Sequence, residues 1–251
     1  MPATPAWPPK SLPRLFVEAT LSEGAAVTLD GPQANYLGNV LRLGVGGQVL
    51  LFDGASGEWI AIVVQMTRKS MQLTVERRTK VAEAVPDLWL AFAPVKRTQL
   101  DWLVEKATEL GVARLMPVVT RRTVVERIKR ERLRSIAVEA AEQCGRTMLP
   151  TIDEPVALER LLKDRDPGRT LYFADETGGE PMVTAFESGP GPGRGLILTG
   201  PEGGFTVEER ELIRAAVGVR PISLGPRILR AETAALAAVA GWMAFAGDWR
   251  N

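Results

Sequence analysis

The stretch that decides the fold is Leu196-Ile197-Leu198-Thr199-Gly200-Pro201-Glu202-Gly203-Gly204-Phe205-Thr206. It joins an apolar, strand-like run to a glycine-rich turn and to Thr206-Val207-Glu208-Glu209, which has the pattern of a capping box at the start of a helix. In an open α/β sheet, ligands bind at such a junction, because the carboxyl end of the strand meets the amino end of the helix there. A tight connection whose glycines only supply special backbone angles is the alternative. The turn lacks the Lys-Ser/Thr ending of a P-loop, which argues against triphosphate hydrolysis.

Apolar runs of the same kind recur through residues 87–251 and alternate with helical patterns. This alternation predicts a parallel α/β sheet covered on both faces. The expected strands are residues 88–95, 113–119, 170–174, 195–199 and 221–224. Helices are expected at residues 98–110, with Gly111 as the left-handed cap, and along a stripe from 133 to 144 that Gly145 closes. On that stripe, Cys144 is predicted to be a small buried residue rather than a nucleophile.

Residues 13–80 have a different character, with short β-rich runs that turn residues such as Asp53-Gly54 separate. The expected strands are residues 15–17, 26–29, 48–52, 59–64 and 72–75, and one or two helical turns fit residues 33–42. Five short strands indicate a small β-barrel, an architecture that often binds nucleic acid. We expect residues 1–12 to form a flexible tail and residues 77–86 to link the barrel to a second domain at 87–251.

Composition excludes several classes of protein. The 251 residues include 31 Lys and Arg against 30 Asp and Glu, no histidine, and one cysteine. These counts exclude a disulfide framework, Ser-His-Asp and Cys-His centres, and metal sites that need imidazole or several thiolates, so no metal is expected. The first ten residues lack the features of a secretory signal, and the longest apolar stretch, 233–246, is shorter than the roughly 20 residues that span a bilayer. We therefore expect a soluble, cytoplasmic protein that does not contact the membrane.

A second cluster of functional residue types is Ser223-Leu224-Gly225-Pro226-Arg227-Ile228-Leu229-Arg230-Ala231-Glu232-Thr233-Ala234-Ala235-Leu236. A short strand ends at Gly225-Pro226, a compact stretch with two arginines follows, and a helix begins near Glu232 or Thr233. A charged loop before a capped helix is the structural alternative. The alanine-rich helix permits close backbone packing, and the polar loop before it is compact. Both features favour a functional loop over a merely solvated one.

The glycine-rich turn and this second cluster together resemble the signature pair of the ribosomal RNA small-subunit methyltransferase E family. Five ordered blocks are far more specific than one glycine loop, and the resemblance covers almost the whole chain, from about residue 13 to residue 245. The other blocks that match in order are Arg14, Val40-Leu41-Arg42, Lys106-Ala107-Thr108-Glu109-Leu110-Gly111-Val112, Glu139-Ala140-Ala141-Glu142-Gln143-Cys144-Gly145-Arg146 and Pro150.

The resemblance implies a fold, a cofactor and a reaction. Members are similar to the SPOUT methyltransferases, in which an α/β domain ends in a deep trefoil knot that binds S-adenosylmethionine. They carry an N-terminal PUA-like barrel, act as homodimers, and methylate N3 of one uridine in 16S ribosomal RNA of the small ribosomal subunit. The residues that the resemblance places around the cofactor are Leu198, Thr199, Gly200, Glu202, Gly203, Leu224, Gly225, Ile228, Leu229, Arg230, Ala231, Thr233 and Ala234.

The chemistry of this reaction suggests catalytic candidates. The methyl group is already activated on a sulfonium, so the site has to align it with the acceptor nitrogen and help to remove a weakly acidic imide proton. Arg230 is the preferred candidate for stabilising the uracil anion, and Glu232 or Glu202 could accept the proton. Arg230 pairing with Glu232, or proton loss to water, remain the alternatives.

RNA binding requires local positive charge, because phosphate contacts supply most of the affinity. Residues 121–134 contain seven basic and two acidic residues, and a solvated helix face is the structural alternative. The candidate RNA-binding residues are Arg14, Arg42, Lys96, Arg97, Arg121, Arg122 and Arg146. Two other functions stay open: a SPOUT methyltransferase for another RNA nucleotide, and a non-catalytic RNA-binding module in ribosome assembly.

Overall fold

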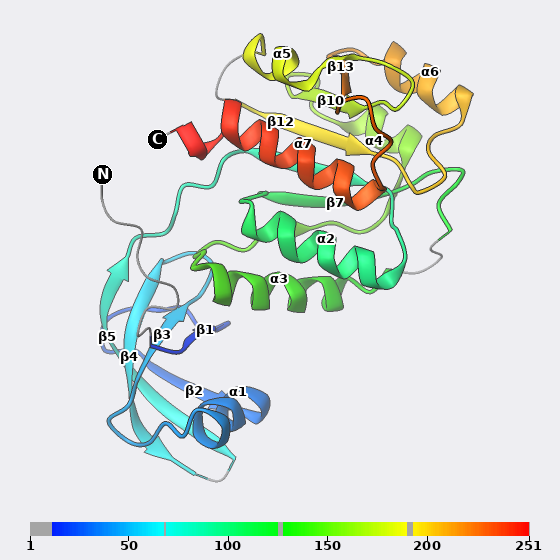
Figure 1. The fold of residues 1–251 in the computed structure, drawn as a ribbon. Coiled ribbons are helices and arrows are strands. Elements are labelled where there is room, and N and C mark those ends of the chain that lie inside the picture. Colours follow the sequence, from blue (N-terminus) through cyan, green and yellow to red (C-terminus); the bar gives the residue numbers. More distant parts are fainter. Residues whose placement is uncertain (1–11, 68, 125–127, 190–192, 251) are drawn as a thin grey trace. The chain divides into compact units, whose positions relative to one another are not determined.

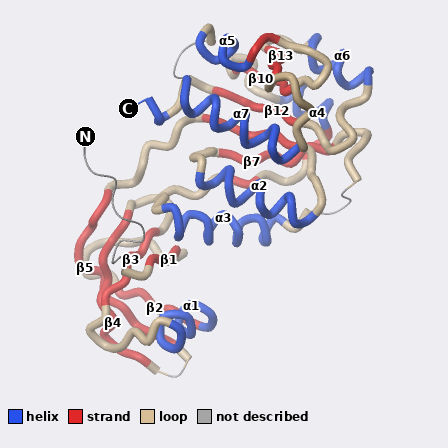
Figure 2. The backbone as a smooth tube through the Cα atoms, in the orientation of Figure 1, coloured by secondary structure: helices blue, strands red, loops and turns tan. Residues whose placement is uncertain are grey.

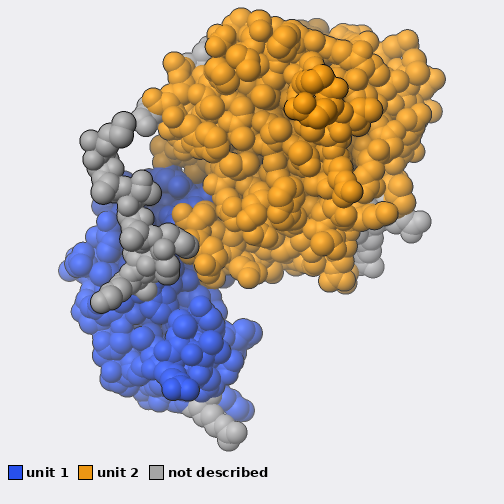
Figure 3. All heavy atoms as spheres, viewed as in Figure 1, with its two compact units in different colours: residues 1–83, 145–148 blue, residues 84–144, 149–251 orange. Residues whose placement is uncertain are grey.

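The computed structural model describes residues 12–67, 69–124, 128–189 and 193–250. The predicted tail therefore lies outside the described residues, except for Leu12. The chain divides into two compact units, one formed by Met1–Glu83 with Gly145–Met148 and the other by Ala84–Cys144 with Leu149–Asn251 (Figure 3). Each unit has its own hydrophobic core.

In the described part of the first unit, five strands form one sheet in the order β1-β3-β4-β5-β2. All five predicted strands and the predicted helical turns are confirmed. β1 pairs parallel to β3, and the other neighbours are antiparallel. The elements are β1 (Arg14–Phe16), β2 (Ala26–Asp30), helix α1 (Gly31–Asn35), the π-helical turn η1 (Tyr36–Val40), β3 (Gln48–Phe52), β4 (Glu58–Met66) and β5 (Ser70–Lys80). The linker begins after Lys80 and not at residue 77, because β5 continues along the bulged β4.

A buried ion pair holds the first strand to the fourth. Arg14 Nε donates to Glu58 Oε2 at 2.6 Å, and Thr79 Oγ1 donates to Glu58 Oε1 at 3.0 Å. The Glu58 side chain is only 3% exposed. Burial by itself would raise the pKa of the Glu58 carboxyl, but the hydrogen bond from Arg14 and the charge of Lys80 outweigh burial, so this pKa is lowered.

The second unit contains a parallel sheet in the order β11-β13-β10-β12-β6-β7-β8, and β9 pairs with β7 in addition. Every strand pair in this described sheet is parallel, which confirms the predicted α/β architecture. Three of the strands, each of two residues, were not predicted, because so short a run carries no periodicity. The strands are β6 (Leu88–Phe92), β7 (Arg114–Val119), β8 (Thr151–Ile152), β9 (Val156–Ala157), β10 (Thr170–Ala174), β11 (Glu180–Pro181), β12 (Gly195–Thr199) and β13 (Val219–Ser223).

Helices cover both faces of this sheet (Figures 1 and 2). One core cluster joins α2, α3, α5 and α7 to one face, and a second joins α4 and α6 to the other. Alternate residues of a strand supply the two clusters: Ile197 belongs to the first, while Leu196 and Leu198 belong to the second. The helices are α2 (Arg97–Glu109), α3 (Arg130–Cys144), α4 (Leu158–Asp164), α5 (Met182–Glu187), α6 (Val207–Ala215) and α7 (Ala231–Phe245), followed by the 3₁₀ turn η2 (Asp248–Arg250).

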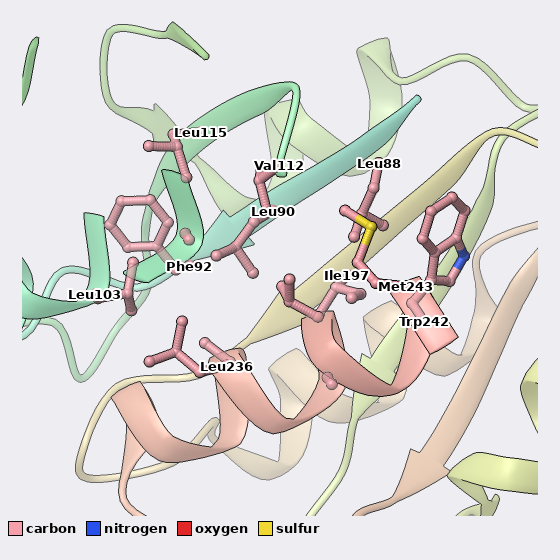
Figure 4. Close-up of a cluster of buried hydrophobic side chains, with 14 of the residues drawn as sticks. Leu88, Leu90, Phe92, Leu103, Val112, Leu115, Ile197, Leu236, Trp242 and Met243 are labelled. Atoms are coloured by element: carbon pink, nitrogen blue, oxygen red, sulfur yellow. The ribbon is translucent and has the colours of Figure 1, made fainter. Parts of the chain in front are cut away.

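Helix α7 is the apolar helix that the sequence placed after the second cluster. Its side chains Leu236, Trp242 and Met243 face Leu90 and Ile197 of the sheet (Figure 4). The helix was expected to begin near residue 232 and begins at Ala231. This packing places its amino end beside the carboxyl ends of β12 and β13, since Ala231 and Glu232 lie on one cavity with Thr199 and Ser223.

Two expectations about helix ends have different outcomes. Gly111, which follows the C-cap Leu110 of α2, has φ +90°, and Gly145, directly after α3, has φ +83°, as the capping argument predicts. The prediction that Cys144 is buried is wrong, because its side chain is exposed. Cys144 continues the stripe of Leu133, Ala137 and Ala140, but it is the last residue of α3. Periodicity describes the face of a helix and does not report how far a neighbour covers that face.

Replacing Glu58 with Gln keeps the shape of the side chain but removes the charge opposite Arg14. We expect Glu58→Gln to lower the free energy of unfolding by about 2 kcal/mol at pH 7. The folded-state pKa of Glu58 is lowered, so its stabilisation is present above the unfolded pKa and is lost as pH falls through the folded pKa. The difference between the two proteins should therefore shrink as the pH falls below the ordinary glutamate pKa of 4.5.

Urea unfolding at several pH values measures this difference. The exposed residue Glu23 provides the control, because Glu23→Gln removes the same charge from a solvated position. Equal losses in the two variants at pH 7 would contradict the assignment of stability to the buried pair.

Candidate functional site

Strands β13, β10 and β12 lie side by side in the sheet, and a cavity of about 800 Å³ opens where their carboxyl ends meet. Three connections line it: residues 174–178 after β10, residues 199–202 after β12, and residues 222–232 after β13. Lys96 and Gln99, at the start of α2, complete the lining together with Ala234. The cavity lies at the edge of a parallel sheet where ligands are expected to bind.

Most of the predicted cofactor residues meet at this cavity. Leu198, Gly203 and Thr233 lie outside its lining. Arg230, Glu232 and Glu202, the three catalytic candidates, all line it; Glu232 is buried, whereas the other two are exposed. The predicted cofactor residues that line the cavity are Thr199, Gly200, Glu202, Leu224, Gly225, Ile228, Leu229, Arg230, Ala231 and Ala234.

The glycine loop, residues 200–206, is folded tightly between β12 and α6. Gly204 has φ +65°, and its N–H donates to the carbonyl of Pro201 at 2.8 Å. A Cβ at Gly200 would lie 2.7 Å from the ring of Phe205, so this position accepts only glycine without a shift of the ring. Phe205 packs edge-on against Phe173 at 5.3 Å between ring centroids. The glycines therefore serve a close approach and a left-handed angle in a turn that also borders the cavity.

The predicted capping box at the end of this loop is present. Glu209 N–H donates to Thr206 Oγ1 at 3.2 Å, and Thr206 N–H donates to Glu209 Oε2 at 2.9 Å. The remaining oxygen, Glu209 Oε1, accepts the backbone N–H of Arg121 at 2.7 Å. The first turn of α6 is thus tied to the turn that follows β7.

The loop after β10 was missed by sequence reasoning. Asp175, whose side chain is fully buried, accepts hydrogen bonds from Thr177 N at 2.9 Å, Thr177 Oγ1 at 2.8 Å and Arg214 Nε at 2.8 Å. These bonds hold a wall of the cavity in one shape. The position of Asp175 could have indicated its role. Asp175 directly follows a predicted strand, as Gly200 does, and the loops after adjacent parallel strands meet at one edge of the sheet.

Charges of both signs border the cavity. Carboxylates come from Asp175, Glu176, Glu202 and Glu232, and cationic groups from Lys96, Arg227 and Arg230. Glu176 also pairs with Arg210 of α6 at 3.1 Å. The site can therefore place positive charge near a developing anion and offer acceptors to the donors of a ligand.

Among the RNA-binding candidates, five are exposed: Arg42, Lys96, Arg97, Arg121 and Arg122. Among the non-glycine residues that the structure describes, Arg42 is the one with a positive φ, +56°.

Arg14 and Arg146 differ from these five. Arg14 pairs with Glu58, its Nη2 donates to the Arg146 carbonyl at 2.6 Å, and the Arg146 side chain is 4% exposed. The Arg146 side chain is buried and the Arg14 side chain is 9% exposed, so we propose that both stabilise the first unit; their contact with RNA stays a prediction.

The amino end of α6 carries a local positive field. Backbone and Thr206 hydrogen bonds at the start of the helix lower the pKa of the exposed Glu208 carboxyl, and the charges of Arg121 and Arg122 lower it further.

No helix of the described residues is long and apolar enough to cross a membrane.

Comparison with known families matches both units. A model described as an RNA methyltransferase domain matches residues 82–243, and one described as an RNA methyltransferase PUA domain matches residues 29–76. Fold and site together define an RNA methyltransferase with an N-terminal PUA domain, which confirms the predicted α/β class with a PUA-like N-terminal domain.

Individual relatives narrow this class. The chain is 31% identical over 228 residues to ribosomal RNA small subunit methyltransferase E of Rickettsia conorii, covering 90% of this chain and 93% of the relative. It is 34% identical over 232 residues to the enzyme of that name from Synechocystis, covering 91% and 74%. The crystal structure of the Neisseria gonorrhoeae enzyme bound to S-adenosyl methionine is 26% identical, with TM-score 0.84, and the match covers 93% of this chain and 98% of that one. The chain belongs to the ribosomal RNA small subunit methyltransferase E family.

Proposed function

We propose that this protein transfers a methyl group from S-adenosylmethionine to N3 of a specific uridine in 16S ribosomal RNA of the small ribosomal subunit. The observation that carries the proposal is the cavity of about 800 Å³. Its lining includes both segments that form the family signature, the glycine loop and residues 224–232. Its placement at the carboxyl edge of a parallel sheet supports a ligand site.

The residues around the cavity suit S-adenosylmethionine. The cavity volume lies within the roughly 300–1,000 Å³ of small-molecule sites. Thr199, Gly200, Leu224 and Leu229 would hold the cofactor through backbone and apolar contacts, since each lines the cavity. The bound cofactor supplies a methyl group that is already activated on a sulfonium.

The protein then has to orient the uracil and stabilise the charge that develops on it. Arg230 lies at the position that precedes the first turn of α7, and it is exposed on the cavity. We propose that its guanidinium group donates hydrogen bonds to uracil carbonyl oxygens and so stabilises the anion that forms when N3 loses its proton. Glu232 on α7 and Glu202 on the glycine loop are the proposed proton acceptors, since both carboxylates border the same cavity.

We propose further that the chain threads as the deep trefoil knot implied by the family, with the glycine loop and residues 224–231 as knot loops around the cofactor. We also propose a PUA-like barrel at 13–80 and a methyltransferase domain at 87–251, with residues 145–148 of the latter range belonging to the first compact unit. A cytoplasmic location is proposed because ribosomal RNA is the substrate.

A direct test of the function is transfer of labelled methyl groups from S-adenosylmethionine to small ribosomal subunits that lack the modification. We expect one uridine per subunit to be methylated, and nucleoside analysis to detect 3-methyluridine. Incorporation into another nucleoside, or into transfer RNA and not the subunit, would overturn the proposed substrate. A chain that fails to bind S-adenosylhomocysteine would overturn the proposed cofactor.

The role of Arg230 is tested by Arg230→Ala. We expect methyl transfer to fall by about 100-fold, the loss typical of removing one group that stabilises an oxyanion, while the affinity for S-adenosylhomocysteine changes little. Arg227→Ala provides the control, because Arg227 is a second exposed arginine of the same loop on the same cavity. Equal losses of transfer in both variants, or equal losses of transfer and cofactor affinity in Arg230→Ala, would contradict the proposed role.

We propose that the active form is a homodimer. Besides the family resemblance, support comes from Ile228 beside α7, which at 93% is the most exposed large apolar side chain of the described residues. Light scattering at working concentration should give twice the chain mass of 27.3 kDa. We expect Ile228→Glu to shift the mass toward the monomer. A monomeric mass for the wild-type protein would overturn the proposal.

A further inference from the structure

The turn after β7, residues 120–123, contacts the glycine loop through one side chain. The guanidinium of Arg122 donates from Nη1 to the Gly203 carbonyl at 2.7 Å. The aliphatic part of Arg122 lies beside the loop as well, because a Cβ at Gly203 would be 3.5 Å from Arg122 Cδ. The contact therefore joins two segments that are 81 residues apart in the sequence. We call residues 120–123 the β7 turn.

The β7 turn is itself well ordered. Thr120 N–H donates to Thr123 Oγ1 at 2.9 Å, and Thr123 N–H donates to the Thr120 carbonyl at 3.1 Å. The backbone N–H of Arg121 is fixed to Glu209 at 2.7 Å, and Glu209 is buried in the capping box. This rigid base presents the Arg122 side chain to the glycine loop.

The glycine loop depends on contacts with other segments. Three of its seven residues are glycines, which lose more conformational freedom on ordering than other residues. Gly204 lies against Glu176 of the loop after β10, because a Cβ added at this glycine would clash with the Glu176 side chain. The Gly203 carbonyl has the Arg122 guanidinium as its partner, a hydrogen bond that the positive charge strengthens.

The same guanidinium belongs to an exposed side chain, which a ligand from solvent can reach. Arg122 is exposed and stands next to Arg121 beside the amino end of α6, where hydrogen bonds at the helix start and the two arginine charges favour the charged form of the Glu208 carboxylate. A guanidinium has five N–H donors, and the hydrogen bond to Gly203 engages one of them. An arginine can therefore bind a phosphate oxygen and a carbonyl oxygen at the same time.

We propose that Arg122 is a positioning residue that couples RNA binding to cofactor binding: it binds an RNA phosphate and the Gly203 carbonyl together, so that RNA on the β7 turn tightens the cofactor loop. This inference rests on the proposed function, because it requires both the RNA and the cofactor. It adds a link between two sites that the function alone does not supply.

The physical basis of the coupling is the entropy of one long side chain. Ordering an arginine costs conformational freedom, and a phosphate that has already ordered it removes that cost from the hydrogen bond to Gly203. Coupling between two ligands is reciprocal, so the cofactor must raise the affinity for RNA by the same factor. Couplings of this kind begin at about fivefold.

The neighbouring arginine provides a matched control. Arg121 contacts Glu209 through its backbone N–H, which Arg121→Ala retains, whereas Arg122 contacts Gly203 through its side chain. Both substitutions remove one positive charge from the same turn. A difference between the two variants therefore reports the contact with the loop and not the loss of charge.

The first measurement is the affinity for labelled S-adenosylhomocysteine, by equilibrium dialysis with the full chain. Without RNA, we expect Arg122→Ala to bind it about fivefold more weakly and Arg121→Ala to bind it as the wild type does. Unchanged thermal unfolding in both variants shows that they are folded. Arg122→Lys retains the charge and one donor, and we expect it to recover part of the affinity.

The second measurement repeats the dialysis with saturating, unmethylated small ribosomal subunits. We expect the subunits to raise the affinity about fivefold in the wild type and in Arg121→Ala, and to leave it unchanged in Arg122→Ala. A merely structural role would lower the affinity of Arg122→Ala but keep the response to subunits, and this outcome would overturn the proposal.

Two further outcomes separate this inference from the proposed function. A wild-type protein that does not bind S-adenosylhomocysteine overturns the function, and the inference fails with it. A wild-type protein that binds it and methylates the subunits, while Arg121→Ala and Arg122→Ala behave alike, overturns the inference and leaves the function in place.

Discussion

The parallel pairing of β10 with both β12 and β13 is the constraint on which the site depends. In register, Tyr172 stands beside Ile197 on one side and beside Arg220 on the other, so the three strands run together and end together. Because all three run in one direction, the connections that follow them must start at one edge. That edge therefore receives three loops, and the cavity forms between loops that are far apart in the sequence.

This constraint explains why the cavity is lined both by the main chain of a glycine-rich loop and by charged side chains. The glycine loop has little side-chain volume, so its main chain borders the cavity. Its own Phe205 ring, the capping box of α6 and the bonds around Asp175 hold it in place. Helix α7 contributes in a different way. Its apolar residues pack on the sheet, and this packing places Arg230 and Glu232 at its amino end beside the cavity. The positions of the catalytic candidates thus depend on hydrophobic contacts along the whole length of the helix.

The sequence predicted those features that local patterns control. Strand β12, the capping box of α6 and the two glycine caps follow from apolar runs and turn chemistry within a few residues, and the structure has them. Features that depend on what packs over a residue were not predictable in this way. Cys144 continues an apolar stripe yet is exposed, and Arg14 matches a family block yet is buried against Glu58. The Asp175 loop was missed for the same reason, since its role depends on Arg214, 39 residues further along the chain.

The absence of histidine affects which residues can remove the proton and which can stabilise the anion in the proposed reaction. Without imidazole, the chain has none of the side chains whose ordinary pKa lies near neutrality. Carboxylates as a class are weak bases, so they can take a proton from a weakly acidic imide only when the resulting anion is strongly stabilised. A group that stabilises the uracil anion must therefore be in place before the proton leaves. A fixed positive charge achieves this without titrating near neutral pH. An arginine at the rim of the cavity meets that requirement, because a guanidinium group donates several hydrogen bonds in one plane. On this reasoning the position of Arg230, set by the packing of α7, has more influence on the rate than the identity of the group that finally accepts the proton.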